Sequence, residues 1–196
     1  IYSYCNRCKD TCCWMRERFI KMSKEEVTAK IIGCAKDSFL HNGYHGTSLK
    51  TICKQAGMTT GALYHRFPGK DALYRAVVEP ATKKLLETLN NCPTNAACSI
   101  MPEQGLILVY LYWDVFRIVV QCRCTSYYNE FYSAIEKSVY HRLSKLNNNY
   151  AEDICWLLSR AYLATFFEII RCDYDFETAK KCIGALENFF APQEIY

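Results

Sequence analysis

The apolar positions along this chain recur at the spacing of helices. The first stripe repeats at every fourth position and predicts an amphipathic helix with one buried face. Ser23 and Glu26 have the spacing of a capping box at its start, and Gly43 favours its end. The pattern therefore predicts a helix over about residues 23–42. Its buried face comprises Val27, Ile31, Ala35 and Phe39.

Two shorter helices are predicted next, joined by a turn that contains glycine. Thr47 or Ser48 can cap the first of them, which breaks at Gly57, and Thr59 or Thr60 can cap the second. A helix of about two turns, a glycine-bearing turn and another short helix have the spacing of a helix-turn-helix unit. A purely structural three-helix unit is the alternative.

The second short helix must be held by its neighbours, because isolated helices under ~12 residues are marginal in water. At about 100° per residue, Leu63 and Phe67 fall on one side of it, and Gly61, Tyr64 and His65 fall on the other. Burial of the leucine and the phenylalanine contributes roughly 1.5–3 kcal/mol each. The opposite side is then free to enter a duplex groove, where polar side chains bind phosphate oxygens or base edges.

These positions belong to a longer motif that runs from about Val27 to Val77. Its centre is the segment "GALYH" at residues 61–65, followed by a phenylalanine and then a lysine. The motif consists of Phe39, Gly43, Tyr44, Thr47, Ser48, Ile52, Ala56, Gly57, Thr59, residues 61–65, Phe67, Lys70 and Leu73. In this combination it resembles the DNA-binding signature of the tetracycline-repressor (TetR) family of regulators.

The resemblance implies an all-α protein. It would have an N-terminal three-helix, helix-turn-helix DNA-binding domain and a C-terminal helical bundle for ligand binding and dimerisation. Such proteins commonly carry lysine or proline where this chain has Thr60, so the sequence preference cannot be carried over. The expected phosphate contacts are Thr47, Ser48, Tyr64, His65 and Lys70, and the expected contacts to base edges are Thr59, Thr60 and Gly61.

Three regions are expected along the chain. Residues 1–21 lack periodicity and precede Met22, so they are expected to be a poorly ordered or non-native extension. Residues 22–69 form the predicted DNA-binding domain. The predicted ligand-binding and dimerisation domain, residues 70–196, has helices over about 70–91, 103–121, 127–146, 151–170 and 176–190.

The last two helices are predicted to form a homodimer. The helix over 151–170 is apolar on two sides, which predicts cover from two directions, and the helix over 176–190 has a narrow apolar seam. We expect both to pair with their copies across a two-fold axis, as the resemblance also implies; an ordinary core hairpin is the alternative. Recognition helices of such a dimer meet half-sites ~34–36 Å apart or a multiple of it, so the expected partner is double-stranded DNA with an inverted repeat.

The helices over about 103–121 and 127–146 are rich in aromatic residues. Such residues commonly form plain core, yet pockets between bundled helices also bind ligands. The expected function is a transcriptional repressor released by an unidentified small apolar or aromatic effector, which would shift the protein away from its DNA-binding form. The candidate ligand-binding residues are Tyr110, Trp113, Asp114, Arg117, Tyr128 and His141.

Charge is divided unevenly along the chain. Residues 1–70 carry 12 Lys and Arg against 5 Asp and Glu, whereas residues 71–196 carry 12 against 15. A basic front on an acidic body indicates a polyanionic partner at the N-terminal end. A solvated basic face would give the same count.

The 13 cysteines are an odd number, so at least one thiol stays unpaired. Most lie singly in predicted helices, as small apolar residues do in a reducing compartment. Cys5, Cys8, Cys12 and Cys13 lie together, but their spacing departs from that of paired zinc ligands. We therefore expect no metal or cofactor. A thiol- or metal-responsive regulator that senses through these four cysteines is the alternative function.

Other classes of protein have little support in the sequence. The chain has no phosphate loop and neither the HExxH nor the GxSxG motif, so no catalytic residue is expected and an enzyme is disfavoured. No run of ~20 uncharged apolar residues is present, and no signal-peptide pattern either. A cytoplasmic protein without a membrane segment is expected.

Overall fold

The structure is a computed structural model that describes residues 23–93, 99–146 and 150–190. Over these residues the chain is helical and has no strand, which confirms the all-α prediction. The helices are α2 (Lys24–Gly46), α3 (Leu49–Ala56), α4 (Thr60–Tyr64), α5 (Lys70–Asn91), α6 (Glu103–Leu111), α7 (Trp113–Gln121), α8 (Ser126–Leu146), α9 (Glu152–Arg171) and α10 (Phe176–Phe190).

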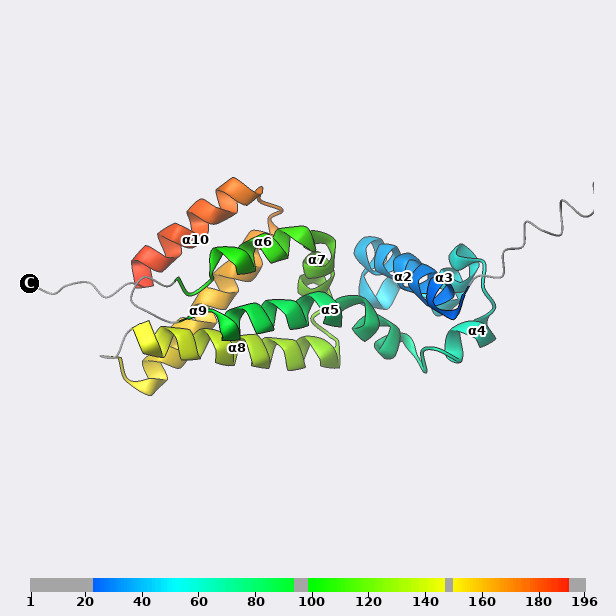
Figure 1. Ribbon diagram of the computed structural model, residues 1–196, viewed down its shortest axis with the longest axis horizontal. Helices are drawn as coiled ribbons and strands as arrows, with labels where there is room; N and C mark the ends of the chain where they lie inside the picture. The colour runs from blue at the N-terminus through cyan, green and yellow to red at the C-terminus, as the bar shows by residue number, and fades with distance from the viewer. Residues whose placement is uncertain (1–22, 94–98, 147–149, 191–196) are drawn as a thin grey trace, which may run out of the picture.

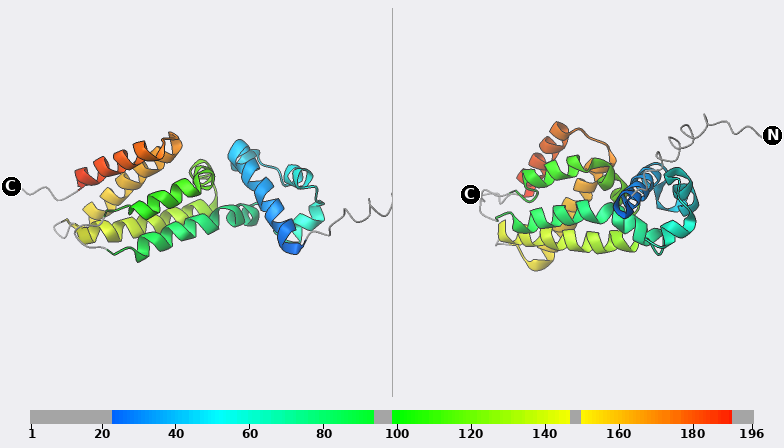
Figure 2. Two further views of the ribbon diagram at one scale, coloured as in Figure 1. Left: turned by 45° about the horizontal axis from the view of Figure 1, so that its top comes forward. Right: turned by 45° about the vertical axis from the view of Figure 1, so that its right-hand side comes forward.

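The helices form two groups along an elongated molecule. Helices α2, α3 and α4 lie at one end, and the bundle of α5 to α10 lies at the other (Figure 1). The views in Figure 2 show the same division, with α5 running from the first group into the bundle. The edge-to-face contact of Phe39 with Tyr74, at 5.3 Å between ring centroids, joins α2 to the start of α5. The division of the chain at residues 69 and 70 remains a prediction, as the first turns of α5 pack on α2.

The start and the end of α2 follow the predicted local chemistry. Ser23 N donates to Glu26 Oε2 at 2.7 Å and Glu26 N donates to Ser23 Oγ at 3.1 Å, so the capping box is confirmed. Gly43 has φ +66° and interrupts the helical backbone, which then continues to Gly46. This left-handed φ suits glycine because a Cβ would strain it. The predicted end at Gly43 is therefore a kink with one more turn after it.

The turn between α3 and α4 is also as the sequence predicts. Gly57 is the C-cap of α3 and has φ +67°, the left-handed conformation expected of a glycine cap. Thr59 is the N-cap of α4, and its side chain accepts a hydrogen bond from Ala62 N at 3.2 Å. These two caps place α4 directly after α3 with a short connection.

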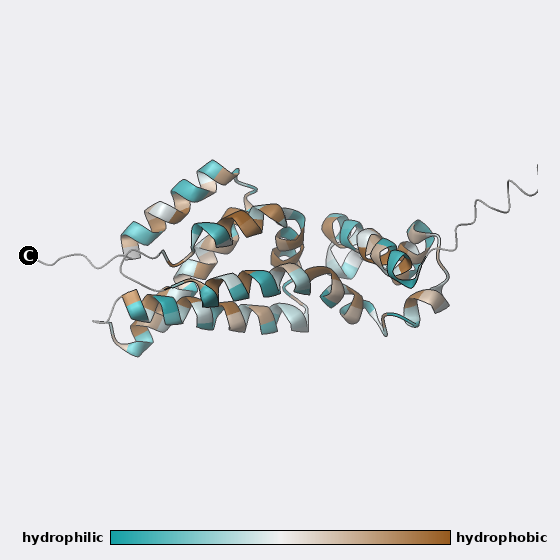
Figure 3. Ribbon diagram, in the orientation of Figure 1, coloured by the Kyte–Doolittle hydropathy of each residue, from teal (hydrophilic) through white to brown (hydrophobic). Residues whose placement is uncertain are grey.

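The single helix predicted over about 103–121 is wrong. The chain forms α6 and α7 instead, because Tyr112 leaves the helical conformation with φ −112° and ψ +35°. The break lets α6 stay against α5 while α7 turns to contact α2, where Asp114 pairs with Lys36 at 2.8 Å. Figure 3 shows apolar residues along much of both helices, so the hydropathy pattern carried no sign of the break.

Some predictions lie outside the described residues. The expected extension over 1–21 and its four cysteines fall there. Within the described ranges, none of the helices combines the length and the apolarity needed to cross a membrane.

Candidate nucleic-acid interface

Helix α4 is held from one side by two buried side chains. Leu63 has no exposed surface and Phe67 is 8% exposed, and both belong to the core shared with Ile31 and Ile52. The prediction that these two residues point inward is therefore confirmed. Arg66 adds polar contacts that helical periodicity does not reveal. Its Nη1 donates to Ala62 O at 3.0 Å and its Nε donates to the hydroxyl of Thr28 on α2 at 3.2 Å.

The opposite side of α4 faces solvent. Tyr64 is 54% exposed, and Thr60, Gly61 and His65 are exposed as well. A Cβ built on Gly61 would meet just the Thr59 hydroxyl, 4.0 Å away, so packing within the chain does not require glycine at this position. The missing side chain leaves open surface beside the exposed hydroxyls. This arrangement allows close approach of another molecule to the backbone of α4.

Ser48, at the start of α3, is also free to contact another molecule. It is the N-cap of α3, yet its side chain makes no capping hydrogen bond to that helix. Its residue is exposed. The hydroxyl and the first backbone amides of α3 can therefore meet an anion such as a phosphate.

Two residues predicted to contact phosphate have hydrogen-bond partners inside the fold. Thr47 is 3% exposed, and its hydroxyl lies 2.7 Å from Gly43 O and 3.0 Å from Ser38 O. Lys70 Nζ donates to Tyr44 O at 2.9 Å and to Thr47 O at 3.1 Å. Both side chains are used inside the fold, where they satisfy carbonyls between the kinked end of α2 and α3. These bonds position the helix-turn-helix unit, and contact of Thr47 or Lys70 with a phosphate stays a prediction.

Tyr44 joins this internal cluster. Its ring lies under Lys70 Nζ, 4.5 Å from the ring centroid, and its hydroxyl donates to Asp71. Burial and then the Asp71 carboxylate raise the pKa of Tyr44 far above its usual value. The phenol therefore stays neutral and keeps its proton for the bond that ties α2 to α5.

None of the pockets between described residues is lined by all six predicted ligand residues. Tyr110 and Trp113 stack at 4.5 Å between centroids and bind the turn before α10, through Tyr110 OH to Tyr174 O at 2.6 Å and Trp113 Nε1 to Asp173 Oδ1 at 2.9 Å. Arg117 Nη1 lies 3.9 Å from the same carboxylate. These three side chains therefore hold α6 and α7 to the turn between α9 and α10.

The other three predicted ligand residues lie elsewhere. Asp114 points to α2 and pairs with Lys36 at 2.8 Å. Tyr128 is 9% exposed and packs against Phe167, at 6.5 Å between centroids. His141 borders a separate cavity of about 380 Å³ beside the C-terminal ends of α5 and α8. These residues therefore lie apart, which helical spacing could not show because it does not tell which neighbour covers each face, and their role in ligand binding stays a prediction.

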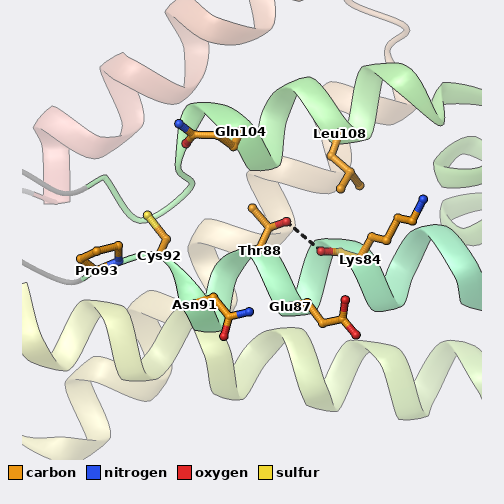
Figure 4. Close-up of a pocket in the computed structure, with 8 residues that line it drawn as sticks. All are labelled: Lys84, Glu87, Thr88, Asn91, Cys92, Pro93, Gln104 and Leu108. Carbon is orange, nitrogen blue, oxygen red and sulfur yellow. Dashed lines mark hydrogen bonds between the residues drawn. The ribbon is translucent and has the colours of Figure 1, made fainter.

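A cavity of about 560 Å³ lies between α5 and α6 (Figure 4). Thr88 and Leu108 point toward each other from the two helices, and Lys84 and Gln104 border the same space. The six predicted ligand residues are not among the lining residues that the structure describes.

Helix α9 presents an apolar face that the rest of the described chain leaves uncovered. Ile154 is 45% exposed and Leu157 is 68% exposed, and Ala161 and Thr165 continue the same face. The second apolar side of α9, which includes Tyr162 and Phe166, is buried in the bundle.

Part of the apolar seam of α10 is buried inside the chain, and its pairing with a copy stays a prediction. Ala179 has no exposed surface and Ile183 is 5% exposed, because they pack in the bundle core. The outward face of α10 carries Lys181, Ala185 and Phe189, of which Phe189 is 75% exposed. This face is open to a second copy of the chain.

Comparisons with known proteins agree with the geometry of the N-terminal end. Residues 31–77 match the family described as "Bacterial regulatory proteins, tetR family". The HTH-type transcriptional regulator UidR of Escherichia coli K12 is 41% identical over 54 residues, which is 28% of this chain and 28% of UidR. The chain thus spans under a third of that relative. The HTH-type transcriptional regulator QacR of Staphylococcus aureus is 25% identical over 127 residues, 63% of this chain and 64% of QacR.

Solved structures show the same fold over most of the chain. GusR of Salmonella enterica superimposes with a TM-score of 0.63 at 21% identity, covering 84% of this chain and 93% of GusR. A transcriptional regulator from Aquifex aeolicus VF5 gives a TM-score of 0.62 at 22% identity, covering 83% of this chain and 99% of that structure. Residues 31–77 of this chain are thus similar to the DNA-binding segment of TetR-family transcriptional regulators, and the chain as a whole shares the fold of these solved structures.

Proposed function

We propose that this protein is a transcriptional repressor that binds double-stranded DNA as a homodimer and is released by a small effector. TetR-family regulators bind DNA and act as dimers. The observation that carries the proposal is the orientation of α4. Its Leu63 side is buried, while Tyr64, His65 and Gly61 are presented to solvent on the other side. A helix so placed can enter a major groove, with side chains that reach phosphates and base edges.

Each exposed residue of the unit has a role in this proposal. Ser48, Tyr64 and His65 contact phosphates and set the position of the unit on the duplex. Thr60 and Gly61, with the cap residue Thr59, lie against base edges. Phosphate contacts supply affinity for any sequence, whereas base contacts supply preference. Because a regulator that binds chromosomal DNA must have access to it, we propose that the protein is located in the cytoplasm.

A second copy of the chain is the proposed occupant of the exposed face of α9. Ile154 and Leu157 there are large apolar side chains at helical spacing, and small residues follow them. Such a face suits close packing against an identical helix around a two-fold axis. The outward face of α10, with Phe189, would extend it.

The two-fold axis gives the DNA target its geometry. Two α4 helices related by the axis must reach successive major grooves on one side of the duplex, ~34–36 Å apart or a multiple of it. An inverted repeat is therefore the proposed target. Repression would follow when the bound dimer covers DNA that the transcription machinery needs.

Release by an effector needs a path from the bundle to α4. Helix α7 contacts both α9 and α2, and α5 runs from α2 into the bundle. A small apolar or aromatic molecule that binds the bundle better in another arrangement would shift the population away from the DNA-binding form.

The test uses the purified chain and duplexes selected from a random-sequence library. Selection should enrich an inverted repeat, and the logarithm of the affinity should fall with the logarithm of salt concentration by ~0.9 per phosphate contact. Fluorescence anisotropy at several salt concentrations measures this slope. Failure to enrich any duplex, or a flat salt dependence, contradicts DNA binding.

The dimer is tested separately by sedimentation equilibrium. Leu157→Glu places a charge on the exposed face of α9 and should convert the dimer to a monomer. Leu111→Glu is the matched control, because Leu111 is 74% exposed on α6, outside that face. A protein that is monomeric before any substitution, or a Leu157→Glu variant that stays dimeric, contradicts the proposed interface.

A further inference from the structure

A small pocket with an arginine rim lies where the C-terminal ends of α7 and α9 meet. Its volume is about 260 Å³, just below the ~300–1,000 Å³ range of ligand sites. We refer to it as the arginine pocket. Its lining consists of Arg117, Val120, Gln121, Arg123, Ile170 and Arg171.

The charges at this pocket are not balanced within it. Arg117 reaches Asp173 at 3.9 Å, the outer limit of an ion pair, and that carboxylate already accepts from Trp113 Nε1 at 2.9 Å. Arg171 pairs with Glu168 on its own helix. Arg123 Nε donates to Val120 O at 3.2 Å, and no carboxylate of the described ranges pairs with it. Three guanidinium groups thus share two carboxylates, which leaves a positive site.

The floor of the pocket has the opposite character. Val120 is 4% exposed and Ile170 is 1% exposed, and both belong to the bundle core. A bound molecule would therefore meet donors at the rim and carbon atoms beneath. Guanidinium groups match the geometry of carboxylate and phosphate through paired N–H donors. An apolar floor adds affinity for a short hydrocarbon or an aromatic ring.

We propose that the arginine pocket binds a small organic anion, in which a carboxylate or phosphate is attached to a short apolar or aromatic group. Arg117, Arg123 and Arg171 hold the oxyanion, and Val120 and Ile170 contact the apolar group. This class of ligand is narrower than the class of small apolar or aromatic effectors given above. Its charged end is an essential part of recognition.

Occupancy of the pocket bears on DNA binding through α7, and this step rests on the proposed function. Arg117 of the pocket and Asp114 lie in the same turn of α7, and Asp114 pairs with Lys36 of α2 at 2.8 Å. Helix α2 forms the core behind α4. An anion that binds Arg117 in place of Asp173 changes how α7 packs against α9. Helix α7 also contacts α2 in the DNA-binding end.

Binding is tested first, by isothermal titration calorimetry on the full chain without DNA. The probes are benzoate and phenyl phosphate, and benzamide is the uncharged control of the same shape. At least one of the two anions should bind, and benzamide should bind at least about tenfold more weakly, because it lacks the charge-assisted hydrogen bonds. Equal binding of benzamide, or no binding by either anion, overturns the proposal.

Variants locate the site. Arg123→Gln should weaken binding of the better anion about fivefold to tenfold, the loss expected for a charge-assisted hydrogen bond at a partly exposed site. Arg123 is exposed, so its replacement should leave the thermal melting curve unchanged. Lys83→Gln is the matched control, because it removes one charge from an exposed position on α5 that does not line the pocket. Equal weakening by both variants, or by neither, contradicts the assignment.

The coupling is tested on the selected duplex. The better anion should change DNA affinity of the unsubstituted chain by ~5–150-fold, the usual range of coupling between sites. The Arg123→Gln variant should need a correspondingly higher concentration of anion. If the chain binds DNA and the anion does not bind, the pocket proposal fails alone. If the anion binds and no duplex does, the regulatory function fails alone. If both bind without changing each other, the coupling fails.

Discussion

Two short segments of this molecule are held in place by contacts of different kinds. Helix α4 is held by the apolar side chains of Leu63 and Phe67. Residues 99–101, which lead into α6, are held by polar bonds from Arg142 of α8 and Glu187 of α10. The apolar contacts leave the other side of α4 free for a partner, whereas the polar contacts enclose their segment within the bundle.

The polar contacts include four hydrogen bonds from one guanidinium group. Arg142 is 2% exposed. Its Nε donates to Ile100 O at 2.9 Å and its Nη2 to Ser99 O at 2.7 Å, while its Nη1 donates to Leu89 O at 2.9 Å and to Cys92 O at 3.1 Å. The buried charge is therefore surrounded by carbonyl oxygens. It closes the end of α5 against the start of the next segment.

Glu187 completes this cluster from α10. Its Oε1 accepts from Ser99 Oγ and Met101 N at 2.8 Å each, and from Tyr162 OH at 3.1 Å. Burial first, and then the Glu187 carboxylate, raise the pKa of Tyr162 well above its usual value. The two segments differ in whether their contacts can be predicted from the sequence. Leu63 and Phe67 are four residues apart, whereas Arg142 and its acceptors are separated by 42 to 53 residues.

The largest effect on stability is expected from Arg142→Met. Methionine keeps much of the volume but leaves the carbonyl oxygens without their donor, and the loss should be about 4 kcal/mol or more. Lys137→Met is the control, because Lys137 is exposed on the same helix. Urea denaturation followed by circular dichroism measures both free energies of unfolding. A loss under about 1 kcal/mol would show that water replaces the guanidinium donors.

A slightly smaller loss is expected from Leu63→Ala. The substitution opens a cavity behind α4 and should lower the free energy of unfolding by about 3 kcal/mol. DNA affinity should fall with it, because α4 is no longer held in one orientation. The same denaturation experiment and anisotropy on the selected duplex measure the two effects. Unchanged DNA affinity in a destabilised variant would show that α4 is ordered by the duplex instead.

Glu187→Gln should lower the free energy of unfolding by less than Arg142→Met or Leu63→Ala does. Glutamine keeps a carbonyl oxygen in place of the carboxylate but loses the charge that strengthens the three bonds, so a loss of about 1–2 kcal/mol is expected. Gln104→Glu can serve as a control for charge at the edge of the bundle, since Gln104 is exposed on α6. An unchanged free energy of unfolding for Glu187→Gln would show that Arg142 alone holds residues 99–101.

Tyr64→Ala should have the smallest effect on stability and a clear effect on DNA binding. Tyr64 is 54% exposed, so the free energy of unfolding should change by no more than about 0.5 kcal/mol. Affinity should fall about tenfold on all duplexes alike, as expected when a phosphate contact is lost. Thr60→Ala is its counterpart and should change the ranking of duplexes. If Tyr64→Ala alters the ranking instead, the tyrosine contacts bases.

Sequence reasoning succeeded where neighbours along the chain decide the structure. The capping box of Ser23 and the left-handed turn at Gly57 depend on backbone groups within a few residues. The inward side of α4 also follows from helical spacing, once a core exists behind it. These features determined the helix-turn-helix unit and its outward face.

Contacts with partners that are distant in the sequence could not be predicted from it. Thr47 and Lys70 are polar residues beside an expected DNA surface, yet their donors satisfy carbonyls inside the fold. Asp114 and Arg117 are near neighbours on one helix, yet they pair with different segments. Spacing gives the direction of a side chain relative to its own helix but not the identity of the group that it meets.

The sequence by itself therefore determined the helical class, the DNA-binding signature and the exposed face of α4, because these depend on local periodicity and local caps. The tertiary structure alone decided the break between α6 and α7, the separate positions of the expected ligand residues, the carbonyl oxygens around Arg142 and the arginine pocket. Each of these arises where helices distant in sequence meet, and a buried charge or an unpaired guanidinium group acquires its role there from the neighbours that packing provides.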